Sequence, residues 1–275
     1  MNTNFDKALS QLQKITNQSF AKDFYLESLQ KKIYLKEINV SQQKVLLDHA
    51  IASKQPEQIN KTDKFAEINF NLIKDNITEG LSEEEIQNLT IWDKNLLSLA
   101  LRSLSNEKVT LTYFTKNDTE PESKAFVEFN ISDIINKYNA SYKEILTKKN
   151  IIQQSEQTNT TFSINLKLPT IIEEIEVEKF MPDNHTAGDV FLYEMTKYIE
   201  SLSVDNLLIN FKELTLDQKL ILIQNLPSNV GNSIINEINT IKDKLYKPLD
   251  LEWQDKFADK HYYNIIINSE WFLNY

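Results

Sequence analysis

A leucine-rich helical stretch that leads into a strand-like run is the feature that most constrains the fold of this chain. The leucines of residues 92–104 recur at the spacing of one helical face, namely Leu96, Leu97, Leu101 and Leu104. The run Val109–Phe114 that follows is made of β-branched, aromatic and leucine residues, as in a strand. A helix with one apolar face must bury that face against another element. The sequence therefore predicts an α+β fold, mainly helical, with short antiparallel β-hairpins.

Apolar periodicity and turn residues predict the other elements. Helices are expected over residues 3–16, between Ser41 and Pro56, over 64–74, from Ser82, over 92–104, 132–148 and 189–202, from Thr215, and over 233–245. Strands are expected over residues 24–29, 32–38, 109–114, 125–131, 161–168, 171–180, 249–253 and 262–267. Ser82–Glu85 and Thr215–Gln218 each have the spacing of a capping box.

A polar run rich in Gln, Asn and Thr suggests where the chain is divided. We expect an N-terminal amphipathic arm over residues 1–20, a first α+β lobe over 21–149, a polar linker over 150–161 and a second α+β lobe over 162–275. The two lobes would share an order of β elements, helices and a hairpin. The tetrapeptide Ile-Gln-Asn-Leu also occurs in both, at 86–89 and 223–226. These observations leave open whether the lobes are similar through duplication.

The residue chemistry argues against an enzyme. Cysteine is absent, and the glycines at positions 80, 188 and 231 are too isolated for a nucleophile elbow, a phosphate loop or a dinucleotide fingerprint. Asp183, His185 and Asp189 are the best metal candidate, but turn residues before a capped helix explain them better. We therefore predict no catalytic residues, no cofactor and no metal.

The charge distribution and the short apolar runs exclude other classes of partner. Residues 1–60 carry eight lysines and six acidic residues, whereas residues 166–275 carry ten lysines and eighteen acidic residues. An acidic surface repels phosphate backbones, so nucleic acid is not expected as a partner. The longest aliphatic run, Leu220–Ile223, is far shorter than the ~20 residues of a membrane helix. Met1–Phe5 lacks the pattern of a secretory signal, so we expect a soluble protein synthesised in the cytoplasm.

Four residues are candidates for binding a partner protein. Arg102 is the only arginine of the sequence and lies at the edge of the leucine-rich helix. It could pair within the chain with a carboxylate such as that of Asp93, or it could face a partner. The aromatic residues Trp271, Phe272 and Tyr275 pose the same alternative, because they could seal a core or anchor an interface.

The order of these features resembles the baseplate hub family of T-even-type, contractile-tailed bacteriophages. The resemblance is carried by the leucine-rich helix, the hairpin that follows it and a terminal aromatic pair. The corresponding residues here are Leu89, Trp92, Asp93, Leu97, Leu101, Arg102, 109–114, 125–131, Trp271 and Phe272. Some relatives carry Cys-x-x-Cys pairs at the hairpin turns, where this chain has 116–124 and 254–260, so any zinc bound there has been lost here.

The resemblance implies a structural subunit of the tail baseplate hub that acts through contacts with other baseplate or tail hub proteins during tail assembly. Its location would be the virion tail, after synthesis in the host cytoplasm. An alternative is a hub assembly factor or chaperone that is absent from the mature virion.

Overall fold

The computed structural model of this chain describes residues 7–8, 10–12, 21–54, 65–115, 123–145, 149–155, 160–181, 185–205 and 207–273. The helices are α2 (Val40–Ser53), α3 (Phe65–Asn76), α4 (Glu83–Gln87), α5 (Ile91–Ser105), α6 (Ile131–Ile145), α7 (Ile171–Phe180), α8 (Ala187–Tyr198), α9 (Leu216–Gln224) and α10 (Ser228–Tyr246). The strands are β1 (Lys22–Leu26), β2 (Lys31–Leu35), β3 (Ile77–Glu79), β4 (Lys108–Thr115), β5 (Ser123–Asn130), β6 (Lys149–Ser155), β7 (Thr160–Leu166), β8 (Ile199–Val204), β9 (Leu207–Asn210), β10 (Asp250–Gln254) and β11 (Lys260–Asn264). Short 3-10 helices are η2 (Phe211–Glu213), η3 (Lys247–Leu249) and η4 (Ser269–Phe272).

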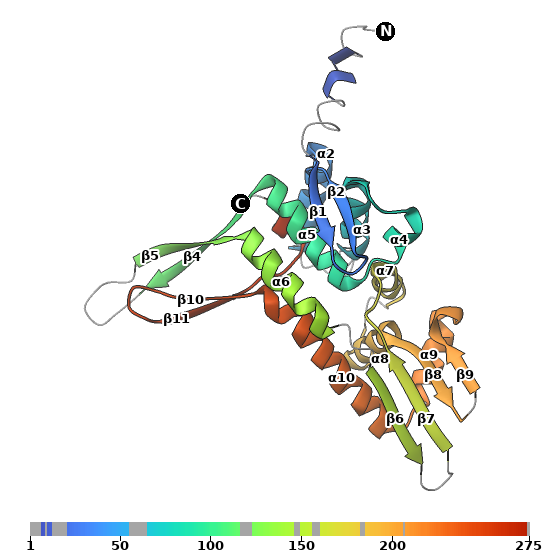
Figure 1. The fold of residues 1–275 in the computed structure, drawn as a ribbon. Helices are drawn as coiled ribbons and strands as arrows, with labels where there is room; N and C mark the ends of the chain where they lie inside the picture. Colours follow the sequence, from blue (N-terminus) through green and yellow to red (C-terminus); the bar gives the residue numbers. More distant parts are fainter. Residues whose placement is uncertain are drawn as a thin grey trace. The chain divides into compact units, whose positions relative to one another are not determined.

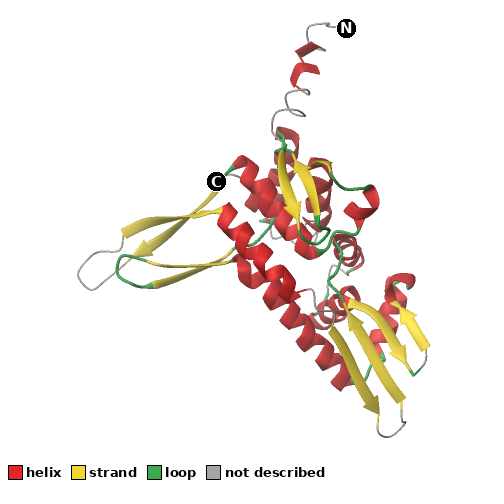
Figure 2. Ribbon diagram, viewed as in Figure 1, coloured by secondary structure: helices red, strands yellow, loops and turns green. Residues whose placement is uncertain are grey.

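The sheets are small and antiparallel. Their strand orders are β1-β2-β3, β4-β5, β6-β7-β8-β9 and β10-β11. Helices account for much of the rest of the described chain (Figure 2). This combination confirms the predicted α+β class.

The chain divides into two compact units that are not consecutive in the sequence. The described residues of unit 1 fall within Met1–Ile86, Asp93–Ala140 and Pro248–Tyr275, and those of unit 2 within Gln87–Trp92 and Ser141–Lys247. This division differs from the predicted lobes over 21–149 and 162–275, because the C-terminal segment belongs to unit 1. The similarity of the two lobes stays a prediction.

The predicted linker over 150–161 is largely sheet. Strands β6 and β7 pair antiparallel across it, with Ile151 opposite Ile164 and Gln153 opposite Phe162. Polar composition alone suggested a linker, but a strand with one solvated face tolerates Gln, Asn and Thr. The predicted arm over 1–20 lies mostly outside the described residues, and those described, 7–8 and 10–12, are helical.

The core of unit 1 is organised around α5. Leu96, Leu97 and Leu101 are fully buried, as the spacing of the leucines predicts. Buried polar side chains on α5 are paired with neighbouring helices: Asn95 Nδ2 donates to the Tyr138 hydroxyl at 3.1 Å. Ser98 Oγ donates to Asn69 Oδ1 at 3.2 Å. Such bonds fix which face of α5 meets which partner, because an unmatched buried polar group is costly.

Several helix starts follow from local capping. The predicted boxes are present: Ser82 and Glu85 exchange backbone and side-chain hydrogen bonds, and so do Thr215 and Gln218. The helix expected from Ser41 starts earlier, because Asn39 and Gln42 form its capping box. A capping box requires that the capping residue and its partner be three residues apart, so that each side chain reaches the backbone N–H of the other. Another polar residue near the helix start, such as Ser41, is easily mistaken for the cap.

Two sequence predictions in unit 2 were wrong. Residues 171–180 form α7 and not a strand, with Thr170 and Glu173 as its capping box. The acidic residues mimic strand alternation, but Ile171 and Ile175 are buried at helical spacing. The helix expected over 189–202 ends at Tyr198, where the chain continues directly as β8.

Unit 2 joins segments that are distant in the sequence. Thr90 and Thr170 form an isolated antiparallel bridge. It is flanked by hydrogen bonds from Ile91 N to Pro169 O and from Ile171 N to Leu89 O, each of 2.9 Å. The short segment Gln87–Trp92 is therefore held in unit 2 by backbone pairing, and Trp92 packs there on the ring of Tyr142 at 4.3 Å.

Gly80 is required by the turn after β3. Its φ of +106° is in the region that favours glycine, and an added Cβ would lie 2.5 Å from Lys32 O and 2.8 Å from Ile33 Cα. We expect Gly80→Ala to destabilise the protein by at least about 1–3 kcal/mol, measured by chemical denaturation. Gly231→Ala is the matched control, because nothing lies within 4 Å of a Cβ there and α10 should gain about 0.5–1 kcal/mol. A free energy of unfolding of Gly80→Ala equal to that of wild type would contradict the requirement for glycine in this turn.

Candidate functional site

Two antiparallel hairpins of unit 1, β4–β5 and β10–β11, form a projection that we call the hairpin arm. They lie side by side and extend from the helical part of the unit (Figure 1). In β4–β5 the pairing runs from Lys108 opposite Asn130 to Thr115 opposite Ser123. In β10–β11 it is centred on Glu252 opposite Tyr262. The arm thus joins two segments that are far apart in the sequence, because about 120 residues separate the end of β5 from the start of β10.

Aromatic rings fill the space between the two hairpins. The Trp253 ring lies 5.5 Å from that of Tyr113 and 5.8 Å from that of Phe129, both edge to face. On its own hairpin it stacks on the ring of His261 at 5.3 Å and 16°. The rings of Tyr113 and His261 are 4.8 Å apart. Aromatic pairs of this kind stabilise a fold by more than the area they bury. Trp253 contacts rings of both hairpins and is therefore the centre of the arm.

Asp255 fixes the turn of β10–β11. Its Oδ1 accepts hydrogen bonds from the backbone N–H groups of Phe257 at 2.8 Å and Asp259 at 3.0 Å, and Oδ2 lies 3.2 Å from His261 Nε2. The side chain has no exposed surface. Loss of solvent raises the pKa of this carboxyl group, but the hydrogen bonds and the nearby histidine outweigh that effect and lower the pKa overall. Ala258 completes the turn with a positive φ of 66°.

The outer surface of the arm exposes large apolar side chains. Phe114 and Phe126, which are 60% and 63% exposed, lie on the face of β4–β5 turned away from Trp253. Tyr262, which is 64% exposed, lies on the face of β10–β11 opposite to that of Trp253 and His261. Aromatic residues are enriched in the contact surfaces of proteins, and exposed apolar surface marks an interaction site. The arm is therefore the candidate interaction surface of unit 1.

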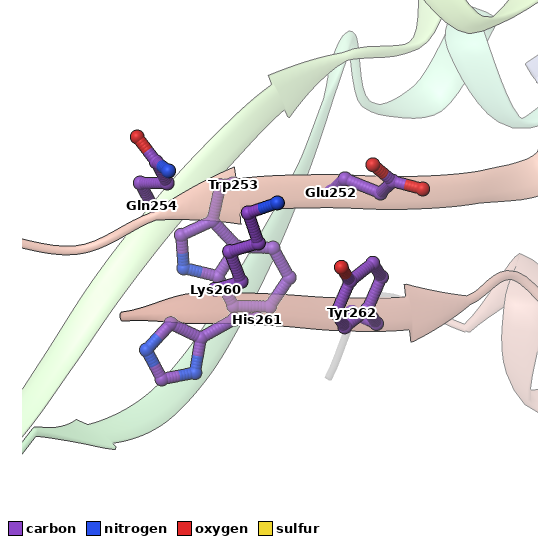
Figure 3. A pocket seen from close by; sticks show the side chains of 6 residues that line it. All are labelled: Glu252, Trp253, Gln254, Lys260, His261 and Tyr262. Carbon is purple, nitrogen blue, oxygen red and sulfur yellow. The ribbon is translucent and has the colours of Figure 1, made fainter. Parts of the chain in front are cut away.

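An open hollow of about 290 Å³ lies on β10–β11. Six side chains line it, those of Glu252, Trp253, Gln254, Lys260, His261 and Tyr262 (Figure 3). These side chains bring a carboxylate, an amide, an ammonium group and a phenol to it, together with the rings of Trp253 and His261. Such a surface suits a partner side chain better than a reacting small molecule, because ligand pockets bury most of their ligand.

Arg102, Trp271 and Phe272, three of the predicted partner-binding residues, do not lie on the arm. The Arg102 guanidinium carbon lies 5.8 Å from the centre of the Trp271 ring, and burial lowers the pKa of Arg102. Trp271 Nε1 donates to Ser98 O at 3.3 Å. Phe272 is only 3% exposed, and Tyr275 lies outside the described residues. A role of Arg102, Trp271, Phe272 and Tyr275 in binding a partner stays a prediction.

The C-terminal segment around η4 is tied to α2 and α5. Ser269 Oγ lies 2.8 Å from His49 Nδ1, and Lys54 Nζ lies 2.5 Å from Glu270 Oε1. Asn268 Oδ1 accepts from Trp271 N at 3.1 Å and caps η4. These contacts use the aromatic pair Trp271–Phe272 within unit 1.

The suggested pairing of Arg102 with Asp93 does not fit α5. Nine residues along one helix correspond to about 13 Å of rise and to opposite sides of the helix. Asp93 accepts instead a hydrogen bond from Ser28 Oγ. Arg102 is used as a planar cation against an indole ring, a role that lysine fills less well.

The metal candidate of the sequence analysis is a helix cap where it is described. Asp189 Oδ2 accepts from Thr186 N at 2.7 Å and Thr186 Oγ1 at 2.8 Å, and these bonds lower the pKa of Asp189. Asp183 lies outside the described residues, and His185 precedes the cap. Within the described residues, no three His, Asp or Glu side chains are grouped closely enough to hold a metal ion.

A partly buried charged cluster in unit 2 is structural. Glu194 of α8 pairs with Lys197 at 2.5 Å and with Lys242 of α10 at 2.7 Å. Burial raises the pKa of the neighbouring Tyr198, and it raises that of Tyr246 to about 12. Both tyrosines therefore stay neutral, and the cluster joins two helices and presents no group poised for proton transfer at neutral pH.

Sequence reasoning missed the arm residues. The sequence places Phe114 in a strand. Whether its side chain is covered or exposed depends on which face of the ribbon Trp253 packs against, and this is not visible in the sequence. One signal was present: in the alternating run Val109–Phe114, Phe114 shares the face of Thr110 and Thr112, where a polar residue would be expected.

The architecture is that of an α+β protein with a projecting aromatic surface. The chain belongs to the T4 bacteriophage base plate protein family, whose profile matches residues 20–253. No curated protein and no solved structure matches the chain. Membership confirms the resemblance to T4-type baseplate proteins. None of the helices in the described part of the chain is long and apolar enough to cross a membrane.

Asp255→Asn tests the turn of the arm through its pH dependence. Because the pKa of Asp255 is lowered on folding, its stabilisation is complete above the ordinary value of 3.8 and is lost as the pH falls through the folded value. We expect Asp255→Asn to lower the melting temperature at neutral pH and the difference from wild type to shrink in acid. Tryptophan fluorescence of thermal unfolding measures both.

Asp259→Asn in the same turn is the control for Asp255→Asn, because only the backbone of Asp259 takes part in the bonds to Asp255. A difference between Asp255→Asn and wild type that persists unchanged in acid would exclude this role of the carboxylate.

Proposed function

We propose that this chain is a structural subunit of the baseplate hub of a contractile-tailed bacteriophage and that it acts through protein–protein contacts in tail assembly. The observation that carries the proposal is the hairpin arm of a baseplate-family protein, with its exposed aromatic side chains. Its partners are other baseplate or tail hub proteins, and its location is the tail of the virion. It performs no catalysis and binds neither nucleic acid nor a membrane.

The composition of the arm supports contact with protein. Phe114, Phe126 and Tyr262 offer large rigid groups that lose little side-chain entropy on binding. On its face of β5, Phe126 lies between Lys124 and Glu128, and Glu128 pairs with Lys108 at 2.6 Å. An apolar centre with a polar rim is the usual anatomy of a protein interface.

The acidic second half of the sequence supports a different contribution. Residues 166–275 carry eighteen acidic residues against ten lysines, and this excess of negative charge favours basic partner surfaces and disfavours phosphate backbones. Such charges act on orientation and association rate more than on affinity. The exposed aromatic side chains of the hairpin arm would then supply the affinity for the partner protein.

Quantitative mass spectrometry of purified virions tests the structural role. We expect this protein to be recovered in a fixed, small number of copies per particle, together with the other baseplate proteins. Its absence from complete particles, with presence in infected cells, would contradict the proposal and favour the assembly factor or chaperone.

A second test concerns the arm itself. In a phage that lacks its own copy, we expect complementation with Tyr262→Ser to lower incorporation into tails, because it removes an aromatic ring that is 64% exposed. Ile221→Ser on α9 is the matched control, since its side chain is 59% exposed and lies in unit 2. Equal incorporation of both variants would show that the arm is not the contact surface. Circular dichroism of both purified variants establishes that they fold.

A further inference from the structure

We propose that two copies of this chain associate through the free edge of β5, forming a continuous antiparallel sheet in the order β4-β5-β5-β4. The inference concerns self-association of the isolated protein and goes beyond the proposed role in the hub. It rests on the charge pattern of β5, on the unpaired edge of that strand and on the small size of the ribbon to which it belongs.

The first observation is the open edge. Among the described strands, β5 pairs with β4 alone. Alternate residues on its other side therefore direct N–H and C=O groups away from the ribbon, ready to pair with another strand. A two-stranded ribbon is marginal in water, and further strands stabilise it.

The second observation is the outer face of β5. Lys124, Phe126 and Glu128 are exposed and follow one another at every second residue, so they lie on one face. The inner face carries Ala125, Val127 and Phe129, which are less exposed. The exposed face is thus a cation, an aromatic ring and an anion in a row.

This row is complementary to itself. When two β5 strands run antiparallel about Phe126, each Lys124 is opposite Glu128 of the other copy, and the two Phe126 rings are opposite each other. Directly opposed side chains of opposite charge, and aromatic pairs, stabilise an antiparallel ladder. On the inner face, Ala125 is opposite Val127, so both faces match. A two-fold axis through Phe126 gives all of these pairs at once, and two-fold dimers are the commonest oligomers.

The intramolecular contacts of these side chains leave room for the new pairs. Glu128 Oε2 accepts from Lys108 Nζ at 2.6 Å, while its side chain is 53% exposed. Lys124 Nζ lies 5.5 Å from the centre of the Phe126 ring, an exposed contact that a carboxylate can replace. In the dimer each Glu128 would lie between Lys108 of its own chain and Lys124 of the other.

The other strands of the arm lack this match. A corresponding pair of β10 strands about Glu252 places two Glu252 carboxylates opposite each other, which is destabilising. Strand β11 about Tyr262 places Lys260 opposite Asn264, with no charge to meet it. In an antiparallel pair of β4 strands centred on Thr112, no two charged residues of the strands lie opposite each other. Of these four described strands, β5 specifies its own partner best.

Two opposite charge reversals test the pairing. Sedimentation equilibrium of wild type over a micromolar concentration series should give a reversible monomer–dimer equilibrium. In Lys124→Glu two pairs of carboxylates face each other, and in Glu128→Lys two pairs of ammonium groups do. We expect each single variant to raise the dimer dissociation constant by roughly 10-fold or more. An equimolar mixture of the two variants should dimerise again, because the mixed dimer restores an opposite charge at all four positions.

Lys260→Glu and Glu252→Lys on the other hairpin are the matched controls and should leave the dissociation constant unchanged. Circular dichroism establishes that each variant is folded. The proposal is overturned if wild type stays monomeric throughout the series, if either β5 variant dimerises like wild type, or if the mixture fails to recover the dimer. Because the experiment uses the purified chain alone, its failure leaves the hub proposal intact, and virions that lack the protein would leave this proposal intact.

Discussion

The packing of Trp253 between two β-hairpins is the interaction on which the arm depends. Each hairpin is a two-stranded ribbon, which by itself is only marginally stable in water. Trp253 contacts Tyr113 and Phe129 of β4–β5 and stacks on His261 of its own hairpin, so each ribbon supplies the core of the other. The indole Nε1 is buried without a hydrogen-bond partner in the described part of the chain. An unmade hydrogen bond of a buried donor is costly, so the ring packing of Trp253 has to outweigh that cost.

The same contact explains why the two units are not consecutive in the sequence. Once β10–β11 packs on β4–β5, the last segment of the chain must return to unit 1. There Trp271 donates to Ser98 O, and Phe272 is buried. Ser269 and Glu270 add contacts with His49 of α2 and with Lys54, which caps the end of that helix. The end of the chain is thereby fastened to helices formed from its first third and middle, which makes unit 1 dependent on contacts between distant residues.

Local signals in the sequence predicted most elements, and long-range pairing was beyond them. The buried leucines of α5 and the capping boxes of α4 and α9 follow from spacings of three and four residues. Residues 171–180 were misread because their acidic residues imitate a strand, although Thr170 and Glu173 already had capping-box spacing. The hairpin arm was predicted as two separate hairpins, because no local pattern states that Trp253 meets Tyr113. For the same reason Arg102 and Trp271 were suggested as partner-binding residues without their mutual contact.

The sidedness of the ribbons links the fold to assembly. Because strand side chains alternate, covering one face of β4–β5 with Trp253 directs Phe114 and Phe126 to the opposite face. An aromatic side chain on a solvated strand gains nothing in the isolated chain beyond contact with its neighbours, and it raises the risk of unwanted association. In a protein of the base plate family such exposure has a use, since assembly supplies the missing cover. The charges around these rings, Lys124 and Glu128 among them, then restrict which surface can provide it, because opposite charges must meet and like charges must not.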